Sequence, residues 1–324
     1  MTHDWTDHPP LETTTFPPVL DSTMRSAWLT CPHYFLRRHC QGLTTSDDIS
    51  VHLHFGATFA SGLEAARRSY WAGSPQSAAV VDGADAIVKA WGSYTFNPTK
   101  RSEEVKSLDN CLLALTDYFR QWPLDADAVR IHEFEGEPCI EFSGSWPIGI
   151  LHPETGDDIV YAGRFDLIGD RTDLNNEVWG LDDKTGRISD NPEKWTMRGQ
   201  FTGYCWLASK YGLPLKGFLV REVQPLTASI KLNQAVTSRP QWMVDRWFHQ
   251  LQCDVYDMLD AWQAFREQPG GDESAFSRVL DSGCYTFNRP CEFTPLCNAE
   301  YPERWLDTYH VRRWDPLVRE ADTE

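Results

Sequence analysis

Two aspartates and a lysine occupy the ends of two predicted strands, and a polar turn over residues 170–176 joins these strands. Asp166 closes the first strand, and Asp182 and Lys184 close the second. Because strand side chains alternate between faces, Asp182 and Lys184 point one way and Asp183 the other. If the strands pair, Asp166 comes close to both. Two carboxylates could bind Mg²⁺ or Mn²⁺ through their oxygens, and the lysine ammonium could stabilise the charge that develops on a scissile phosphate. The alternative is a surface turn whose charges are solvated.

Two polar residues follow on the next predicted helix, over residues 195–211. Gln200 and Tyr204 are four residues apart, so they share one helix face. Both side chains can contact a backbone phosphate or a bound base. The alternative is the polar rim of an amphipathic helix, but the position directly after the acid-x-lysine strand favours a functional role.

The cysteines near the two chain ends form a second candidate site. The chain has nine cysteines, an odd number that argues against a disulfide framework. Cys284, Cys291 and Cys297 form a closely spaced set, and Cys31 is the best candidate for a fourth ligand, with Cys40 a weaker one. Four thiolates suit zinc or an iron–sulfur cluster, and the spacing does not choose between them. The alternative is free thiols in an unstructured tail. The other cysteines stand among apolar residues and are expected to be buried: Cys111, Cys139, Cys205 and Cys253.

Composition bounds the class of protein. The 324 residues are 41% apolar and 13% aromatic, enough for a sizeable core. The net charge of −17 counts against tight non-specific binding of nucleic acid, although an acidic body can carry a basic groove. No apolar run approaches a membrane span, and the N-terminus lacks a basic and apolar leader. We therefore expect a soluble cytoplasmic protein without a membrane partner.

The hydrophobic period changes from helical to alternating at about residue 128, which indicates a mixed α/β fold rather than a doubly wound sheet. Helices are expected over 22–30, 34–40, 51–70, 78–91, 103–118, 195–211 and 240–265. Strands are expected over 129–134, 139–148, 159–166, 178–182 and 217–223. Arg67 and Arg68 end the helix over 51–70, where cations favour the helix dipole.

The same pattern predicts the division of the chain. We expect a flexible N-terminal arm over 1–21, a helical lobe over 22–125, a catalytic core over 126–267, a cysteine-rich segment over 268–297 and a C-terminal tail over 298–324.

Three motifs in this order resemble a known family. Gly163-x-x-Asp166, Asp182-x-Lys184-Thr185 and Gln200-x-x-x-Tyr204 resemble the PD-(D/E)XK nuclease superfamily in its RecB-like exonuclease branch. The split cysteines resemble the iron–sulfur members of that branch, which include AddB-type nuclease domains, Cas-four-type CRISPR-adaptation exonucleases and phage proteins. The resemblance spans about residues 22–297.

The resemblance implies a restriction-endonuclease-like core, with a central mixed sheet flanked by helices, a helical lobe and a cysteine-stapled C-terminal segment. It makes Asp166 and Asp182 the metal-binding acids and Lys184 the catalytic lysine, followed by Gln200 and Tyr204. It also implies the ligands of a structural [4Fe-4S] cluster: Cys31, Cys284, Cys291 and Cys297.

The chain departs from the family pattern at one place. Many members carry a histidine in a Gly-x-x-x-His arrangement, and counting from Gly56 that place holds Ala60. His52 and His54 both precede Gly56 and are candidates for a role at the site, with His54 the candidate substitute, whereas the alternative for each is a structural role. The upstream acid is one of four glutamates, of which we favour Glu137 as the third metal ligand: Glu133, Glu135, Glu137 and Glu141.

The expected function is a Mg²⁺- or Mn²⁺-dependent DNA exonuclease that acts on single strands or ends. The resemblance implies a phage or prokaryotic setting in recombination, replication or repair, with proteins of those processes as partners. The alternatives are a non-catalytic DNA-end or partner-binding module on the same fold, and a zinc-stapled structural or interaction protein. A site-specific endonuclease differs only in its substrate.

Overall fold

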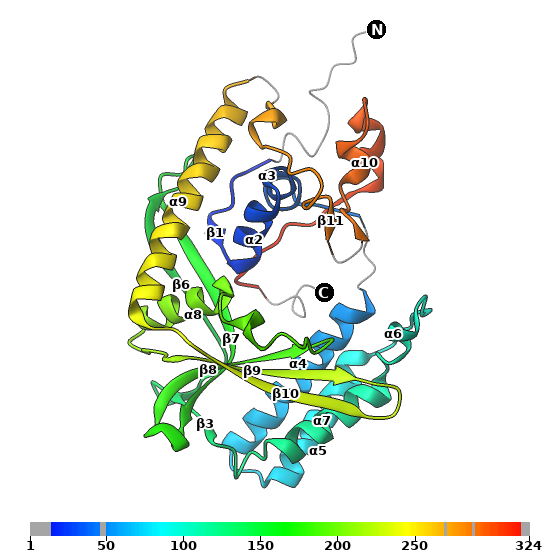
Figure 1. The fold of residues 1–324 in the computed structure, drawn as a ribbon, viewed down its shortest axis with the longest axis vertical. Coiled ribbons are helices and arrows are strands. Elements are labelled where there is room, and N and C mark those ends of the chain that lie inside the picture. Colours follow the sequence, from blue (N-terminus) through cyan, green and yellow to red (C-terminus); the bar gives the residue numbers. More distant parts are fainter. Residues whose placement is uncertain (1–13, 46–49, 269–270, 287–288, 319–324) are drawn as a thin grey trace. The chain divides into compact units, whose positions relative to one another are not determined.

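The computed structural model describes residues 14–45, 50–268, 271–286 and 289–318. The fold is mixed α/β, with a central mixed sheet flanked by helices (Figure 1). The chain divides into two compact units. The sheet unit comprises residues 49–144 and 164–245, and the terminal unit comprises residues 1–48, 145–163 and 246–324. This division differs from the expected boundaries at 125 and 267, because the terminal unit gathers segments from three parts of the chain.

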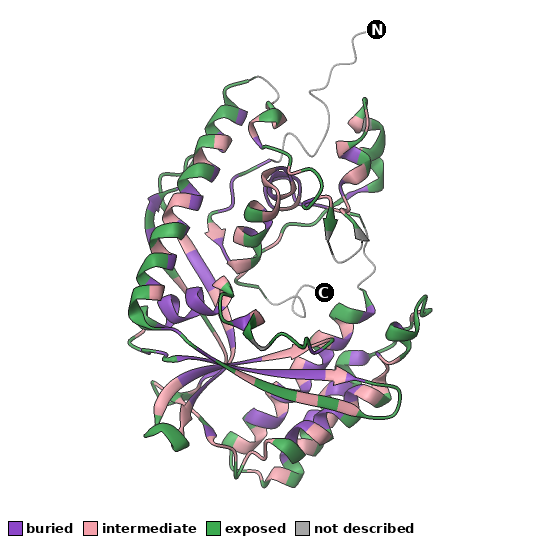
Figure 2. Cartoon of the chain, viewed as in Figure 1, coloured by how far each residue is buried: buried purple, intermediate pink, exposed green. Residues whose placement is uncertain are grey.

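The central sheet has the strand order β1-β7-β8-β9-β10, and β3 and β6 also pair with β7. Its strands are β1 (Val19–Leu20), β3 (Val129–Ile131), β6 (Ile140–Leu151), β7 (Asp158–Arg171), β8 (Glu177–Thr185), β9 (Gly217–Pro225) and β10 (Ile230–Ser238). β7 and β8 are antiparallel, whereas β8 and β9 are parallel, so the sheet is mixed. β9 is buried over most of its length, and β8 is buried over its middle residues 179–182 (Figure 2). β4 (Glu133–Phe134) and β5 (Glu137–Pro138) form a separate hairpin.

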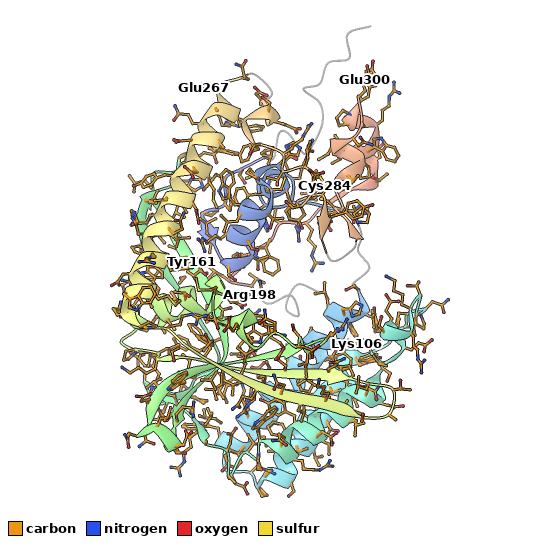
Figure 3. The ribbon with its side chains drawn as sticks, in the orientation of Figure 1. Lys106, Tyr161, Arg198, Glu267, Cys284 and Glu300 are labelled. Atoms are coloured by element: carbon orange, nitrogen blue, oxygen red, sulfur yellow. The ribbon has the colours of Figure 1, made fainter. Side chains whose placement is uncertain are left out.

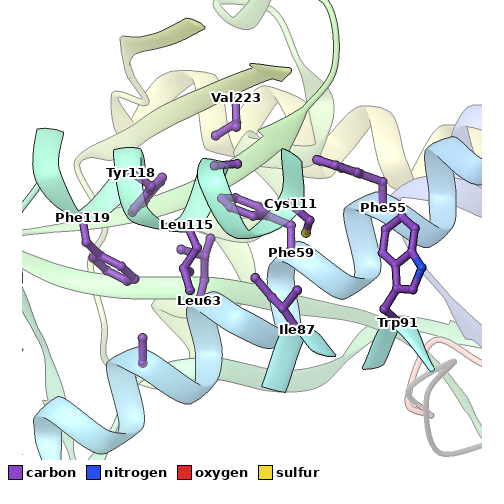
Figure 4. Close-up of a cluster of buried hydrophobic side chains, with 12 residues drawn as sticks. Phe55, Phe59, Leu63, Ile87, Trp91, Cys111, Leu115, Tyr118, Phe119 and Val223 are labelled. Carbon is purple, nitrogen blue, oxygen red and sulfur yellow. The ribbon is translucent and has the colours of Figure 1, made fainter. Parts of the chain in front are cut away.

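The helices α4 (Val51–Trp71), α5 (Gln76–Trp91), α6 (Arg101–Glu104) and α7 (Leu108–Gln121) belong to the sheet unit. Ser50 and Ser107 cap α4 and α7 by accepting hydrogen bonds from backbone amides, as N-cap serines commonly do. α4, α5, α7 and β9 contribute to one buried cluster (Figure 4). α4 and α5 cross closely, since a Cβ at Gly62 would lie 2.5 Å from Ile87 Cγ1.

The helix α8 (Gly199–Lys210) packs against β9 through aromatic rings. Phe201 stacks on Phe218 of β9 with 4.8 Å between ring centroids. Arg239 anchors the segment before the helix by donating to the carbonyl oxygen of Trp195 at 2.9 Å and to that of Arg198 at 3.4 Å. This anchor fixes the entry into α8, which carries the predicted polar pair.

The terminal unit corrects the expected arm and tail. Residues 14–21 are packed rather than flexible: Phe16 is 1% exposed, and β1 pairs in parallel with Val160 and Tyr161. Residues 1–13 lie outside the described residues. In the expected tail, β13 (His310–Val311) pairs with β2 (Leu43–Thr44). Both pairings join segments far apart in sequence, which local patterns do not reveal.

The remaining elements of the terminal unit are mostly short. They are α2 (Ser22–Thr30), α3 (Pro32–Phe35), the π-helix η2 (Leu36–Cys40), most of α9 (Gln241–Arg266), η5 (Glu273–Ala275), β11 (Tyr285–Thr286), β12 (Arg289–Pro290), α10 (Thr294–Cys297) and η6 (Pro302–Thr308). None of the helices within the described ranges has the length and apolar character needed to span a membrane.

Two local expectations also change. The helix expected over 103–118 is instead α6 and α7, with a break between them. Asp166 does not close its strand, because β7 continues to Arg171. The turn into β8 is the short helix η3 (Thr172–Leu174) followed by Asn175 and Asn176, both at positive φ, which asparagine tolerates better than most residues.

Candidate functional site

Asp166 and Asp182 meet where the β7–β8 ladder ends. Leu167 pairs with Leu181 at this end of the ladder. Asp166 directly precedes Leu167 on β7, and Asp182 directly follows Leu181 on β8, so the two acids lie side by side just beyond the last pair. Asp166 Oδ2 accepts a hydrogen bond from the backbone N–H of Asp183 at 2.7 Å. The expectation that strand pairing brings the two acids together is confirmed.

Asp182 and Lys184 share one face of β8, as the alternation of strand side chains predicted. Lys184 Nζ lies 2.7 Å from Asp182 Oδ2, and the Asp182 side chain is only 3% exposed. Apart from this ammonium, Asp182 Oδ2 has no hydrogen-bond partner in the part of the chain that the structure describes. One buried carboxylate oxygen therefore depends on a single cation.

The two acids resist ionisation. Burial raises the pKa of Asp166 well above its ordinary value, and the Asp182 carboxylate adds to the rise. Burial also raises the pKa of Asp182, although the Lys184 ammonium opposes it. At Lys184 burial disfavours the charge, but the two carboxylates outweigh it and raise the pKa. The site thus holds two carboxyl groups against one ammonium, an arrangement that a further cation would stabilise.

Gln200 and Tyr204 lie together on one face of α8, as their spacing predicted. Gln200 Nε2 donates to the Tyr204 hydroxyl at 3.2 Å. Burial raises the pKa of Tyr204 to about 12, and the charges of Asp182 and Asp166 contribute to the rise. The phenol therefore stays protonated beside the two acids and remains a hydrogen-bond donor.

The structure favours Glu141 over Glu137 as the glutamate nearest the site. Glu137 is exposed in the β4–β5 hairpin, outside the central sheet. Glu141 lies on β6, and its charge is one of the causes that raise the pKa of Asp166. Its φ of +51° is uncommon for a residue with a side chain, and such strain is typical of functional sites. No local sequence signal distinguishes these two glutamates.

His54, the expected substitute for the family histidine, packs among aromatic side chains. Its ring stacks on Tyr94, with 3.8 Å between centroids, and meets Trp91 edge-on. Burial lowers the pKa of His54, which is the behaviour of a packed histidine. The start of α4 nevertheless lies against the end of β8, since a Cβ at Gly56 would lie 3.1 Å from Thr185 Oγ1.

Arg198 is a residue that sequence patterns did not single out. Arg198, labelled in Figure 3, precedes α8 and is exposed, and its charge lowers the pKa of Asp182. Its guanidinium lies 5.8 Å from the centre of the Trp195 ring. An exposed cation at this place offers a contact for an anionic group.

The terminal unit brings the four predicted cysteines into one neighbourhood. The backbone N–H of Val279 donates to Cys31 Sγ at 3.5 Å, and Cys284 Sγ donates to the Val279 carbonyl oxygen at 3.8 Å. Cys291 N–H donates to the Cys284 carbonyl oxygen at 2.8 Å. Cys284 lies beside the β11–β12 hairpin (Figure 3), and Cys297 ends α10.

The thiols also act on one another electrostatically. Burial raises the pKa of Cys297, and the charges of Cys31 and Cys284 add to the rise, whereas Arg278 and Arg37 oppose it. Burial raises the pKa of Cys291 to about 11, and neighbouring thiols contribute. Thiols gathered beside two arginines have the donor chemistry of a zinc or iron–sulfur ligand group, because metal binding would stabilise their thiolate forms.

The other cysteines match their expected setting in part. Cys40 is fully buried in η2, where burial raises its pKa, and the Arg313 charge opposes this rise. The structure therefore favours Cys31 over Cys40 as the fourth member. Three of the remaining cysteines are buried, while Cys253 is half-buried.

Within the described ranges, no three histidine, cysteine, aspartate or glutamate side chains converge with the geometry of a metal site. At the sheet, the two acids provide hard oxygen donors that suit Mg²⁺ or Mn²⁺. In the terminal unit, the four thiols provide soft donors that suit zinc or iron.

Comparisons with known proteins add little to this geometry. No family model and no curated protein matches the chain. Among solved structures, the chain is similar to one titled "Crystal structure of SSO0001", with 11% identity, a TM-score of 0.26, and coverage of 67% of this chain and 86% of that one. This low TM-score gives no basis for transferring a function.

Proposed function

We propose that the protein is a metal-dependent nuclease that hydrolyses DNA phosphodiesters, as an exonuclease on single strands or ends. One observation carries the proposal: Asp166 and Asp182 are held together with raised pKa values and share one ammonium, that of Lys184. Such a cluster is unfavourable without a compensating cation. A bound divalent cation together with an anionic substrate provides the compensation.

Asp166 and Asp182 would hold Mg²⁺ or Mn²⁺, with Glu141 as the third acid. When bound, the metal lowers the pKa of its water and polarises the phosphate. Lys184 stabilises the charge that develops on the phosphate, and its ammonium is retained because both acids raise its pKa. Tyr204 and Gln200 supply neutral hydrogen-bond donors beside it, and Arg198 supplies a cation for the adjoining phosphate.

The proposed fold is restriction-endonuclease-like. The antiparallel β7–β8 pair bearing the acids, followed by α8 and the parallel strand β9, supports this assignment. We further propose that Cys31, Cys284, Cys291 and Cys297 hold a structural [4Fe-4S] cluster, with zinc as the alternative. The mutual influence of their thiols supports that ligand set.

A second candidate function is non-catalytic binding of DNA ends, in recombination, replication or repair. Two observations favour it: Ala60 stands where the family carries a histidine, and the net charge is −17. This candidate predicts DNA binding without cleavage in any divalent metal.

Cleavage of end-labelled single- and double-stranded DNA in Mg²⁺ or Mn²⁺ tests the proposal. We expect wild type to cut and Lys184→Ala to lose about 100-fold or more of the rate, as for the loss of one charge-stabilising group. Lys231→Ala, an exposed lysine on β10, is the matched control and should retain full activity. Equal activity of Lys184→Ala would exclude the role of this lysine, and inactive wild type would exclude the nuclease.

A further inference from the structure

Asp183 lies between the two residues of the proposed catalytic face but points to the opposite side of β8. Its side chain is 4% exposed, and Arg67 Nη2 donates to its Oδ2 at 2.8 Å. The Tyr118 hydroxyl donates to Oδ1 at 2.7 Å. Both carboxylate oxygens therefore have buried partners from two helices, α4 and α7.

The network continues to β9. Arg67 Nη2 also donates to the Tyr118 hydroxyl at 2.9 Å, and Arg221 Nη1 donates to it at 3.2 Å. Arg221 Nη2 in turn donates to Asp127 Oδ2 at 2.6 Å. Two arginines thus balance two aspartates, and the tyrosine links them.

Burying these charges costs desolvation free energy, so packing stability alone does not explain why the network is present. Apolar residues of similar volume often give equal or greater stability than buried ion pairs, whereas a satisfied polar network fixes one arrangement. Arg67 was expected to be a helix-end cation, but it is buried, and it lies 116 residues before its partner Asp183 in the sequence. Its partner is the residue between the proposed metal acid and the proposed catalytic lysine.

The same residue also holds Asp166. The β7–β8 ladder ends at Leu167 and Leu181, and the next bond runs from the Asp183 N–H to Asp166 Oδ2, at 2.7 Å. The side chain of Asp183 is thus fixed by the helices on one face of the sheet, while its backbone amide orients the Asp166 carboxylate at the site. A shift of this peptide would move Asp166, Asp182 and Lys184 together.

We propose that Asp183, held by Arg67 and Tyr118, is a positioning residue that sets the alignment of Asp166 with Asp182 and Lys184 for metal binding and phosphodiester cleavage. This inference rests on the proposed function for its kinetic consequence. Its consequence for metal binding can be measured without turnover.

The test compares Asp183→Asn with Asp254→Asn in the full-length protein. Asp254 is a matched control in the terminal unit, since its side chain is also 4% exposed and Arg25 Nε donates to it at 2.7 Å. Loss of a group that orients a metal ligand typically costs about 10- to 100-fold in affinity or activity. For Asp183→Asn we therefore expect a fall of about this size in kcat and in Mn²⁺ affinity by electron paramagnetic resonance, with the KM for DNA little changed.

Asp254→Asn should lower the melting temperature but leave kcat and Mn²⁺ affinity at their wild-type values. If Asp183→Asn does not fold, Tyr118→Phe replaces it, because this variant keeps the ion pair and loses only the hydroxyl. A smaller fall, about threefold in both quantities, is then expected.

Wild-type kcat and Mn²⁺ affinity in the folded variant, or equal losses in Asp254→Asn, would overturn the positioning role. If wild type binds Mn²⁺ but does not cleave DNA, the nuclease proposal fails and the Mn²⁺ comparison still decides the role of Asp183; wild type that binds no Mn²⁺ overturns both.

Discussion

At the scale of single residues, the site is defined by charges that oppose one another. Burial pushes Asp166 and Asp182 toward their neutral forms, whereas the Lys184 ammonium favours the charged form of both and Arg198 also favours that of Asp182. Because the acids raise the pKa of the lysine, the ammonium persists at neutral pH. Binding of an additional cation would therefore stabilise the folded protein, and without that cation the buried acids lower its stability.

The first prediction concerns Asp166→Asn. The folded-state pKa of Asp166 lies above its unfolded value, so the folded state binds more protons and the free energy of unfolding falls as pH rises through this window. The amide removes that titration and can still accept the hydrogen bond from Asp183. In metal-free buffer at pH 8, we expect the variant to melt roughly 2–4 °C above wild type, the shift given by about 1 kcal/mol in a domain of this size.

Addition of Mn²⁺ should reverse the order, because wild type gains more stability from the metal than the variant does. Asp173→Asn, which changes an exposed acid paired with Arg171, is the control and should leave both melting curves unchanged. A variant that melts below wild type without metal would contradict the account of the two acids.

At the scale of elements, β8 is a strand with two functions. One face presents Asp182 and Lys184 to the site, and the other joins Asp183 to the helices behind the sheet. α8 lies on the site face, where Phe201 stacks on Phe218. The position of α8, and hence of Tyr204, depends on how closely Phe218 approaches β8.

Gly180→Ala tests this dependence. Gly180 pairs with Phe218, and a Cβ at this position would lie 2.2 Å from Phe218 Cε1. The ring must move, and overpacking of this kind costs about 1–3 kcal/mol. We expect a lower free energy of unfolding in urea and reduced cleavage, since the displaced ring shifts α8.

The control is Ala235→Ser, at a half-buried position on β10. This serine variant should match wild type in both measurements. Wild-type stability of Gly180→Ala would mean that the β8–Phe218 contact tolerates an extra methyl group.

Sequence patterns predicted the mixed sheet, most helices and the meeting of Asp166 with Asp182 and Lys184, because these follow from strand alternation and local order. They missed β1 and β13, which pair with segments far along the chain. They also favoured Glu137 over Glu141, since only the three-dimensional path of β6 separates the two. The partner of Arg67 was missed for the same reason: it lies on a strand that no local pattern connects to α4.

At the scale of the whole molecule, the terminal unit gathers three segments of the chain, and two of these segments carry the four cysteines. Cys31 comes from the N-terminal segment and the other three from the C-terminal segment. Within this unit Cys291 and Cys297 pack against a small apolar cluster that includes Leu43 and Phe293. An iron–sulfur cluster bound by these thiols would cross-link the N-terminal segment to the C-terminal segment.

Cys297→Ser tests that cross-link. We expect anaerobically purified wild type to be brown and to contain iron, and the variant to lose most of its iron and to melt at a lower temperature, because metal binding is linked to folding. Cys253→Ser is the matched control, a half-buried cysteine on α9 outside the set. Colourless wild type containing zinc would select the alternative metal, and metal-free wild type would contradict the ligand set.

The central claim is that Asp166, Asp182 and Lys184 form one metal-dependent hydrolytic site. Single-turnover cleavage of an end-labelled oligonucleotide, measured against Mg²⁺ concentration for wild type and Asp182→Asn, tests it most directly. The account predicts saturable, Mg²⁺-dependent cleavage by wild type and a loss of about 100-fold or more in Asp182→Asn, whose structure and melting temperature remain close to wild type. Cleavage by wild type in excess chelator, or wild-type rates in Asp182→Asn, would contradict it.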